Sequence, residues 1–323
     1  IGQMGLLTLP LALLQQLDAS TQLTLIVGGL FINHLLAKAG LFWLAGMVDR
    51  SNIKDWSAIA GRPGLLLLLG IMMAALIGLP PFPGFWAKWE LVMLLAGGGQ
   101  YGWIAVILIG SLLEAAYLFR WFSFARRQDE SSMDESQAES AVSFRQQSPV
   151  AIAALLLFCI GYGMATTMQI DTIAMFLPLL AGFALWLIDA LCARMKGLPM
   201  LVVVGAGGLW LTNDLEGINL LFSFLLVGGG LLISIASMYR IDDRRGFYPL
   251  LAVLLLSLAA LLRAKTSLEF FFSWELMTLS SYLLITLGRH GVKPALNYLL
   301  FSLASAYFIL AGFAVAYAAS GSP

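Results

Sequence analysis

The stretch GRPGLLLLLGIMMAALIGLPPFPGFWAKWELVMLLAGGG, residues Gly61–Gly99, decides how the rest of the chain is interpreted. It is a long apolar segment that Pro80, Pro81 and Pro83 interrupt near its centre, with a lysine and a glutamate just past the interruption. A proline removes a backbone donor and frees a carbonyl, and at membrane depth this is tolerated only beside protein or water. We therefore expect a functional feature at this helix break.

Composition sets the class of protein. Of the 323 residues, 60% are hydrophobic and 11% are charged, whereas a soluble domain carries about 25% charged residues. Together with repeated long apolar runs, this predicts an all-α, polytopic transmembrane helical bundle. The 18 basic and 18 acidic residues cancel, so no basic surface for nucleic acid is indicated. The two cysteines each stand alone in an apolar run, and we expect buried small hydrophobes without a disulfide.

Hydropathy predicts about eleven spans, one of them the broken helix at 64–97. A continuous helix through that segment would be roughly 48 Å long, too long for a hydrocarbon core of about 30 Å. A re-entrant hairpin would invert the order of the basic connections that follow, so a single interrupted crossing fits better. The expected spans cover residues 1–17, 23–48, 64–97, 102–124, 149–168, 172–193, 198–213, 218–239, 247–263, 266–287 and 293–318.

Basic residues gather in alternate connections, which predicts the orientation in the membrane. The basic side is expected to be cytoplasmic, with the start of the chain, Ile1, on that side and its end, Pro323, on the outer side. Only Arg263 and Lys265 depart from the alternation. The polar connection 126–147 is expected to be a flexible cytoplasmic loop.

Charged residues inside spans are the candidate site residues, because each costs about 2.5–3.5 kcal/mol on insertion scales. Lys88 follows the break by about one turn, and a lysine that exchanges charged and neutral forms suits a proton relay. The alternative is a structural lysine whose ammonium reaches the membrane interface. Glu90, on another face of the same segment, and Glu114, deep in a later span, are weaker candidates for the proton path.

Two further spans carry candidates. His34 and Lys38 stand four residues apart, so they share one helix face and suit a relay or a gate; the alternative is hydrogen bonding that pins the helix. Glu275 lies near the centre of its span, with Thr278 and Tyr282 completing a polar stripe. It is either functional or part of a buried structural ion pair. No metal-ligand spacing and no dinucleotide, phosphate-loop, nucleophile or iron–sulfur motif appears, so we expect no metal, cofactor or hydrolytic site in this chain.

Three of these segments resemble the antiporter-like subunits of respiratory complex I, a family shared with Mrp-type cation/proton antiporters and membrane-bound hydrogenases. HLLAKAGLFWLAG (34–46) is similar to the family's histidine–lysine helix. GLPPFPGFWAKWEL (78–91) is similar to its discontinuous twelfth helix, whose lysine lies on the exit half-channel. FFFSWELMTLSSYLLI (270–285) is similar to its fifth helix, which carries the glutamate of a lysine–glutamate pair.

The order of these segments is the reverse of that in one family module. The resemblance therefore implies a junction of two tandem modules, with 1–168 as the last five helices of the first and 169–323 as the first six helices of the second. The family's central lysines have no counterpart here, so Glu275 lacks its usual partner, and Leu30 stands where the family often has another histidine. Since the chain lacks an initiator methionine, we expect a piece of a longer polypeptide.

The function implied is translocation of protons, or alternatively Na⁺, by a subunit of a complex I-like or hydrogenase-type redox-driven complex. The proton path would run through half-channels joined by Glu275, Lys38, His34 and Lys88. The expected partners are other membrane subunits and the lipid bilayer of a prokaryotic cytoplasmic membrane, without nucleic acid. One alternative is a redox-independent Mrp-type antiporter subunit, and another is a structural, non-conducting membrane subunit.

Overall fold

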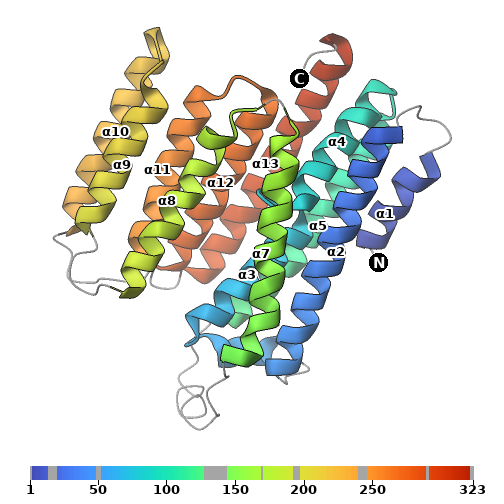
Figure 1. Cartoon of the computed structure of the whole chain (residues 1–323), viewed down its shortest axis with the longest axis horizontal. Coiled ribbons are helices and arrows are strands. Elements are labelled where there is room, and N and C mark those ends of the chain that lie inside the picture. The colour runs from blue at the N-terminus through green and yellow to red at the C-terminus, as the bar shows by residue number, and fades with distance from the viewer. Residues whose placement is uncertain are drawn as a thin grey trace. The chain divides into compact units, whose positions relative to one another are not determined.

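The computed structural model describes residues 2–13, 20–48, 52–126, 144–168, 170–191, 197–238, 246–288 and 291–320. Throughout these ranges the regular structure is helical, so the predicted all-α bundle is confirmed (Figure 1). The elements are α1 (Gly2–Leu13), α2 (Ser20–Val48), the 3₁₀ helix η1 (Ile53–Ile59), α3 (Pro63–Ile77), α4 (Pro83–Gly97), α5 (Tyr101–Ala125), α7 (Phe144–Thr166), α8 (Thr172–Leu191), α9 (Gly197–Thr212), α10 (Gly217–Met238), α11 (Phe247–Arg263), α12 (Ser267–Thr286) and α13 (Val292–Ser320).

Within the described ranges, six helices are long and apolar enough to cross a membrane, namely α2, α5, α7, α8, α10 and α13. Helices α3, α9 and α11 are shorter apolar segments. Each expected span has a helix, and the span 64–97 consists of α3 and α4 with a break between them. Two details differ from expectation: η1 was not predicted, and α7 begins at Phe144 with Pro149 inside it. Most of the expected loop 126–147 lies outside the described residues.

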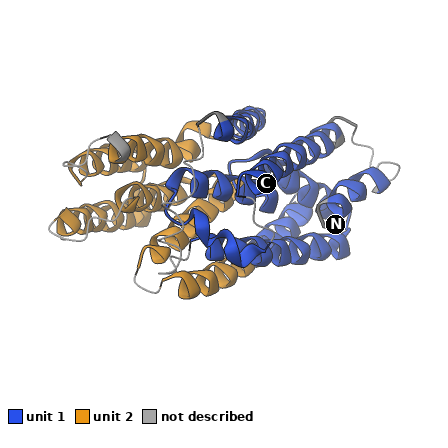
Figure 2. Cartoon of the chain, turned by 90° about the horizontal axis from the view of Figure 1, so that it is seen from below, with its two compact units in different colours: residues 1–168, 307–322 blue, residues 169–306, 323 orange. Residues whose placement is uncertain are grey.

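The chain divides into two compact units (Figure 2). The first contains Ile1–Met168 and Tyr307–Ser322, and the second contains Gln169–Ala306 and Pro323. The expected division placed all residues after 168 in the second unit, whereas in the structure Tyr307–Ser322 groups with the first unit. Assignment of the two units to two family modules stays a prediction.

In the first unit, α3 and α4 lie one after the other along α2. Going along α2 from its carboxyl end, Gly40 packs against Met72 of α3, Asn33 contacts Ala75 at the end of α3, and Gly29 packs against Ala87 of α4. The neighbours advance in one direction, whereas a hairpin would bring α4 back along α3. Figure 1 accordingly shows α3 toward one end of α2 and α4 toward the other. The predicted broken helix at 64–97 is confirmed, and that it crosses the membrane once stays a prediction.

In the second unit, α11 is the central helix and packs against α8, α9, α10 and α12. Small buried residues, Ala252, Ala259 and Ala260, allow these neighbours to approach closely. Arg263, at the carboxyl end of α11, pairs with Asp171 at 3.5 Å and Asp214 at 3.2 Å. Arg263 is one of the two residues that depart from the alternation of basic and non-basic connections, and these ion pairs offset its charge.

Candidate functional site

The break between α3 and α4 is a defined structure in which the local sequence ends one helix and begins the next. The N–H of Leu79 donates to the carbonyl of Ala74, and that of Gly78 donates to the carbonyl of Ala75, both at 3.0 Å. This is the Schellman pattern, which needs a left-handed residue, and Gly78 supplies it with φ +78°. Pro83 then occupies the first turn of α4, where its missing N–H costs nothing. The predicted helix break at Pro80, Pro81 and Pro83 is therefore confirmed as the segment between Ile77 and Pro83.

Lys88 reaches from α4 back to the end of α3. Its ammonium Nζ donates to the carbonyl oxygen of Ile77 at 2.6 Å and to Ser111 Oγ of α5 at 2.9 Å. The side chain is only 5% exposed. The carbonyl end of a helix carries partial negative charge, so this position favours a cation. Lys88 is therefore buried between the end of α3 and α5, and the proton-path role predicted for it stays a prediction.

Asn33 of α2 supplies the second side-chain donor at the break. Its Nδ2 donates to the carbonyl oxygen of Ala75 at 2.8 Å, and the residue is 2% exposed. Gly84 of α4 lies so close that a Cβ at that position would stand 2.7 Å from Asn33 Nδ2. Of the last carbonyls of α3, those of Ala75 and Ile77 thus each receive a side-chain hydrogen bond, from different helices.

The peptide of Pro81 is held from two sides. Trp86, fully buried in α4, donates its Nε1 hydrogen to the Pro81 carbonyl oxygen at 3.0 Å. From α7, Gly161 packs directly against the same carbonyl, and a Cβ there would overlap it. The break is therefore enclosed by α2, α5 and α7, and its backbone has little room to rearrange without moving one of them.

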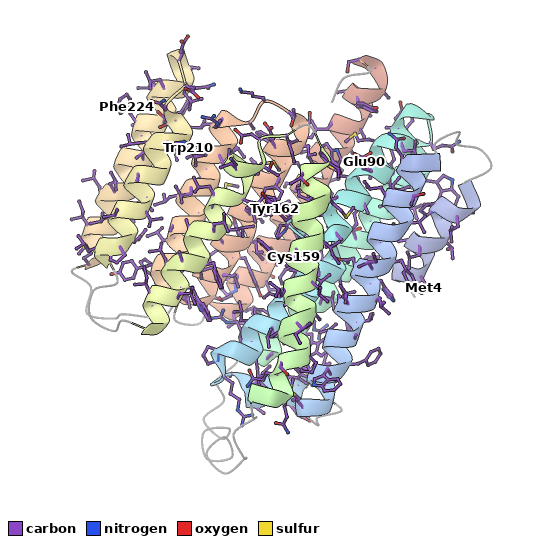
Figure 3. The ribbon with its side chains drawn as sticks, viewed as in Figure 1. Met4, Glu90, Cys159, Tyr162, Trp210 and Phe224 are labelled. Atoms are coloured by element: carbon purple, nitrogen blue, oxygen red, sulfur yellow. The ribbon has the colours of Figure 1, made fainter. Side chains whose placement is uncertain are left out.

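The other predicted site residues of the first unit belong to α2, α4 and α5. His34 and Lys38 are partly buried on the face of α2 beside Asn33, and Asn33 is the α2 residue bonded to the break. Glu90 of α4 (Figure 3) and Glu114 of α5 are also partly buried. The proton-path roles predicted for these four residues stay predictions.

Glu275 belongs to the second unit, where it lies in α12. It is 2% exposed, and Thr278 and Tyr282 on the same stripe are also buried. The polar stripe predicted from the sequence therefore faces the protein interior. Whether Glu275 works together with Lys88 stays a prediction, since the two residues lie in different units.

Two residues at the site, Asn33 and Ser111, were not predicted from the sequence. A signal for Asn33 exists: Ile26, Leu30, Ala37 and Leu41 form a buried stripe at helical spacing, and position 33 falls on it. Ser111 likewise lies on the buried stripe of α5. A polar residue on the packed face of a span must find a partner, and both of these do. A correction concerns Cys159, which was expected to be buried but is exposed on α7 (Figure 3).

Comparison with known proteins finds similarity to the same family that the sequence motifs resemble. Residues 1–115 match a family model described as NADH:quinone oxidoreductase/Mrp antiporter, TM. A NADH-quinone oxidoreductase subunit N from Desulforudis audaxviator is 38% identical over 96 residues, which cover 28% of this chain and 19% of the relative. A subunit N from Hirschia baltica is 27% identical over 133 residues, covering 39% of this chain and 28% of the relative. No solved structure matches the chain.

The chain thus spans between about a fifth and just over a quarter of the length of these two relatives. The match over residues 1–115 includes α2, the whole helix break and most of α5, the elements that hold Lys88. The resemblance inferred from the sequence motifs is therefore confirmed over residues 1–115, where the chain is similar to the family of NADH:quinone oxidoreductase subunits and Mrp antiporters.

Proposed function

We propose that the chain is part of a subunit that translocates protons across a membrane, with Lys88 as a residue that takes up and releases the proton. One observation carries the proposal: a buried lysine donates to the Ile77 carbonyl and to Ser111 Oγ inside an interrupted crossing. A lysine in a span is costly, so its retention at this depth favours a function that uses its charge.

The neighbours of Lys88 suit both of its protonation states. A charged ammonium can donate to the Ile77 carbonyl and to Ser111 Oγ at the same time. After the proton leaves, the neutral amine can accept a hydrogen bond, and the hydroxyl of Ser111 can reverse its role and donate. Because a hydroxyl serves as donor and acceptor alike, a proton can arrive or leave without stranding a buried polar group.

The relatives support a place for this subunit beside others. The names of the matched proteins, NADH-quinone oxidoreductase subunit N, favour partner membrane subunits of a complex I-like assembly in a prokaryotic cytoplasmic membrane. A hydrogenase-type assembly and Na⁺ in place of the proton are the finer alternatives. Within the chain, Glu275, Lys38 and His34 are proposed as further groups of the path, with Glu90 and Glu114 as weaker candidates. No cofactor is proposed in this chain.

The proposal is tested with Lys88→Arg and Lys88→Ala in the assembled complex. Arginine keeps several N–H donors for the Ile77 carbonyl but holds its proton at all physiological pH values. Substrate-driven acidification of inverted membrane vesicles measures translocation, and native gel electrophoresis measures assembly. We expect both variants to assemble and to pump at least tenfold more slowly, which corresponds to about 1.4 kcal/mol or more in the barrier. Lys54→Ala, an exposed lysine on η1, is the matched control and should pump normally.

A second function deserves a test because Lys88 also acts as a cap on α3. If the chain is a non-conducting structural subunit, the only task of Lys88 is to donate to Ile77. Lys88→Arg would then pump at the normal rate, while Lys88→Ala would fail to assemble. That pair of results would overturn the translocation proposal. Acidification that depends on Na⁺ and proceeds without a redox substrate would instead favour the Mrp-type alternative.

A further inference from the structure

We infer that Asn33 is a positioning residue for Lys88, holding the end of α3 in the place where the Ile77 carbonyl meets the ammonium. The inference rests on the proposed function, since it assigns a role to Asn33 through the residue that would carry the proton. It assigns to α2 a contact with the break that neither His34 nor Lys38 provides.

The chemistry at Ala75 sets the orientation of the Asn33 amide. A backbone carbonyl only accepts hydrogen bonds, so the side-chain atom 2.8 Å from it must be the NH₂ group. The Ala75 carbonyl also accepts the N–H of Gly78 at 3.0 Å. Asn33 therefore bonds to the same carbonyl that closes the Schellman turn, and it ties α2 to the final turn of α3.

The position of Ala75 matters for Lys88 because both carbonyls belong to the last turn of α3. The carbonyl that Asn33 holds and the carbonyl that Lys88 binds belong to Ala75 and Ile77, two residues apart in one turn. Across the break, Gly84 approaches both Asn33 and the Ala75 carbonyl, which a Cβ at Gly84 would meet at 2.7 Å and 3.3 Å. One amide thus fixes the end of α3 relative to the start of the helix that bears Lys88.

Packing alone does not account for an amide at this position. Its neighbours on the buried stripe of α2, Leu30 and Ala37, are apolar. Burying an amide is unfavourable unless its polar atoms are bonded, and within the described residues Asn33 Oδ1 has no hydrogen-bond partner. An apolar side chain would fill the same space without that cost. The retained amide therefore points to the hydrogen bond with Ala75 as its purpose.

The test uses Asn33→Ala and Asn33→Ser in the assembled complex, with two measurements. One is substrate-driven proton pumping relative to electron transfer, and the other is hydrogen exchange of the peptide that contains Gly78 and Leu79. The two variants differ by one hydroxyl, and only serine can still donate toward the Ala75 carbonyl. We expect Asn33→Ala to pump about tenfold more slowly and to exchange about tenfold faster at the break. Asn33→Ser should recover part of both losses.

Gly84→Ala reaches the same contact from the other side, because its Cβ would displace the intact Asn33 amide. It should reproduce the defect of Asn33→Ala, and the double variant should lose less than the product of the two single losses. Leu35→Ala, on the exposed face of α2, is the control and should leave both measurements unchanged.

In a Lys88→Ala background, Asn33→Ala should cause no further loss of pumping, because a positioning residue acts through the residue that it positions. Normal pumping and unchanged exchange in Asn33→Ala would overturn the inference, as would an undiminished further loss in the Lys88→Ala background. If Lys88→Ala itself pumps normally, the proposed function fails, whereas faster exchange at Gly78 in Asn33→Ala would still support the structural part of the inference.

Discussion

Gly78→Ala is the substitution that most directly probes the geometry of the break. Gly78 adopts φ +78°, ψ 42°, a left-handed conformation. A Cβ added there would also stand 2.9 Å from Lys88 Nζ and 3.1 Å from its Cε. The new methyl group therefore imposes two separate costs, one on the backbone at Gly78 and one on the hydrogen bonds of Lys88.

The two costs can be given magnitudes. An alanine in the left-handed region is less stable than glycine by about 1–2 kcal/mol. The ammonium must move away from the Ile77 carbonyl to avoid the methyl group, and a hydrogen bond to a charged group contributes about 1.5–3 kcal/mol. Because Lys88 is buried, solvent does not replace that bond. We expect Gly78→Ala to lower the free energy of unfolding by about 2.5–5 kcal/mol.

A double-mutant cycle with Lys88→Met separates these contributions. Unfolding is followed by tryptophan fluorescence during titration of the detergent-solubilised protein with a denaturing detergent. Methionine at position 88 has no ammonium to displace, so Gly78→Ala in that background should cost only the backbone contribution of about 1–2 kcal/mol. Gly110→Ala of α5, whose Cβ would meet nothing within 4 Å, is the control and should not destabilise the protein.

Equal costs of Gly78→Ala with and without Lys88 would refute the reasoning. Such a result would mean that the ammonium is not held at the end of α3 in the way the distances imply. A cost near zero in both backgrounds would refute the left-handed conformation of Gly78 as well.

Three further predictions concern other contacts, each measured as a change in the free energy of unfolding by the same titration. Gly161→Ala should cost about 1–3 kcal/mol, because its Cβ would overlap the Pro81 carbonyl and overpack the site. Gly163→Ala on the same helix is the control and should be neutral. Equal effects of the two substitutions would contradict the packing of α7 against Pro81. Glu269→Gln should cost about 1–3 kcal/mol, because both carboxylate oxygens accept backbone N–H groups and an amide offers only one acceptor; an unchanged stability would contradict this cap. Arg263→Met should cost only about 0–1 kcal/mol, less at high salt, since its acidic partners are more than one-third exposed; a loss above 2 kcal/mol would contradict this estimate.

A good part of the fold and the central residue of the site could be predicted from sequence. Long apolar runs with few charges admit only helices in a membrane, because every backbone polar group must be satisfied within the span. Gly78 ends one helix and Pro83 begins the next through local backbone chemistry, because the residues responsible are neighbours in sequence. Lys88 was recognisable because a charge in such a run is costly wherever the run packs.

What only the tertiary structure decided is which residues surround Lys88. Asn33 and Ser111 are ordinary polar residues in the sequence, and they become part of the site because α2 and α5 turn those faces toward the break. The ion pairs of Arg263 likewise became visible only in the structure, because their acidic partners, Asp171 and Asp214, lie far from it along the chain. Local chemistry determines where a helix begins, breaks and ends, since the responsible residues are neighbours in sequence. Contacts between helices depend on rotation and register, which arise from the interlocking of whole side-chain surfaces, and no single stretch of sequence contains that information.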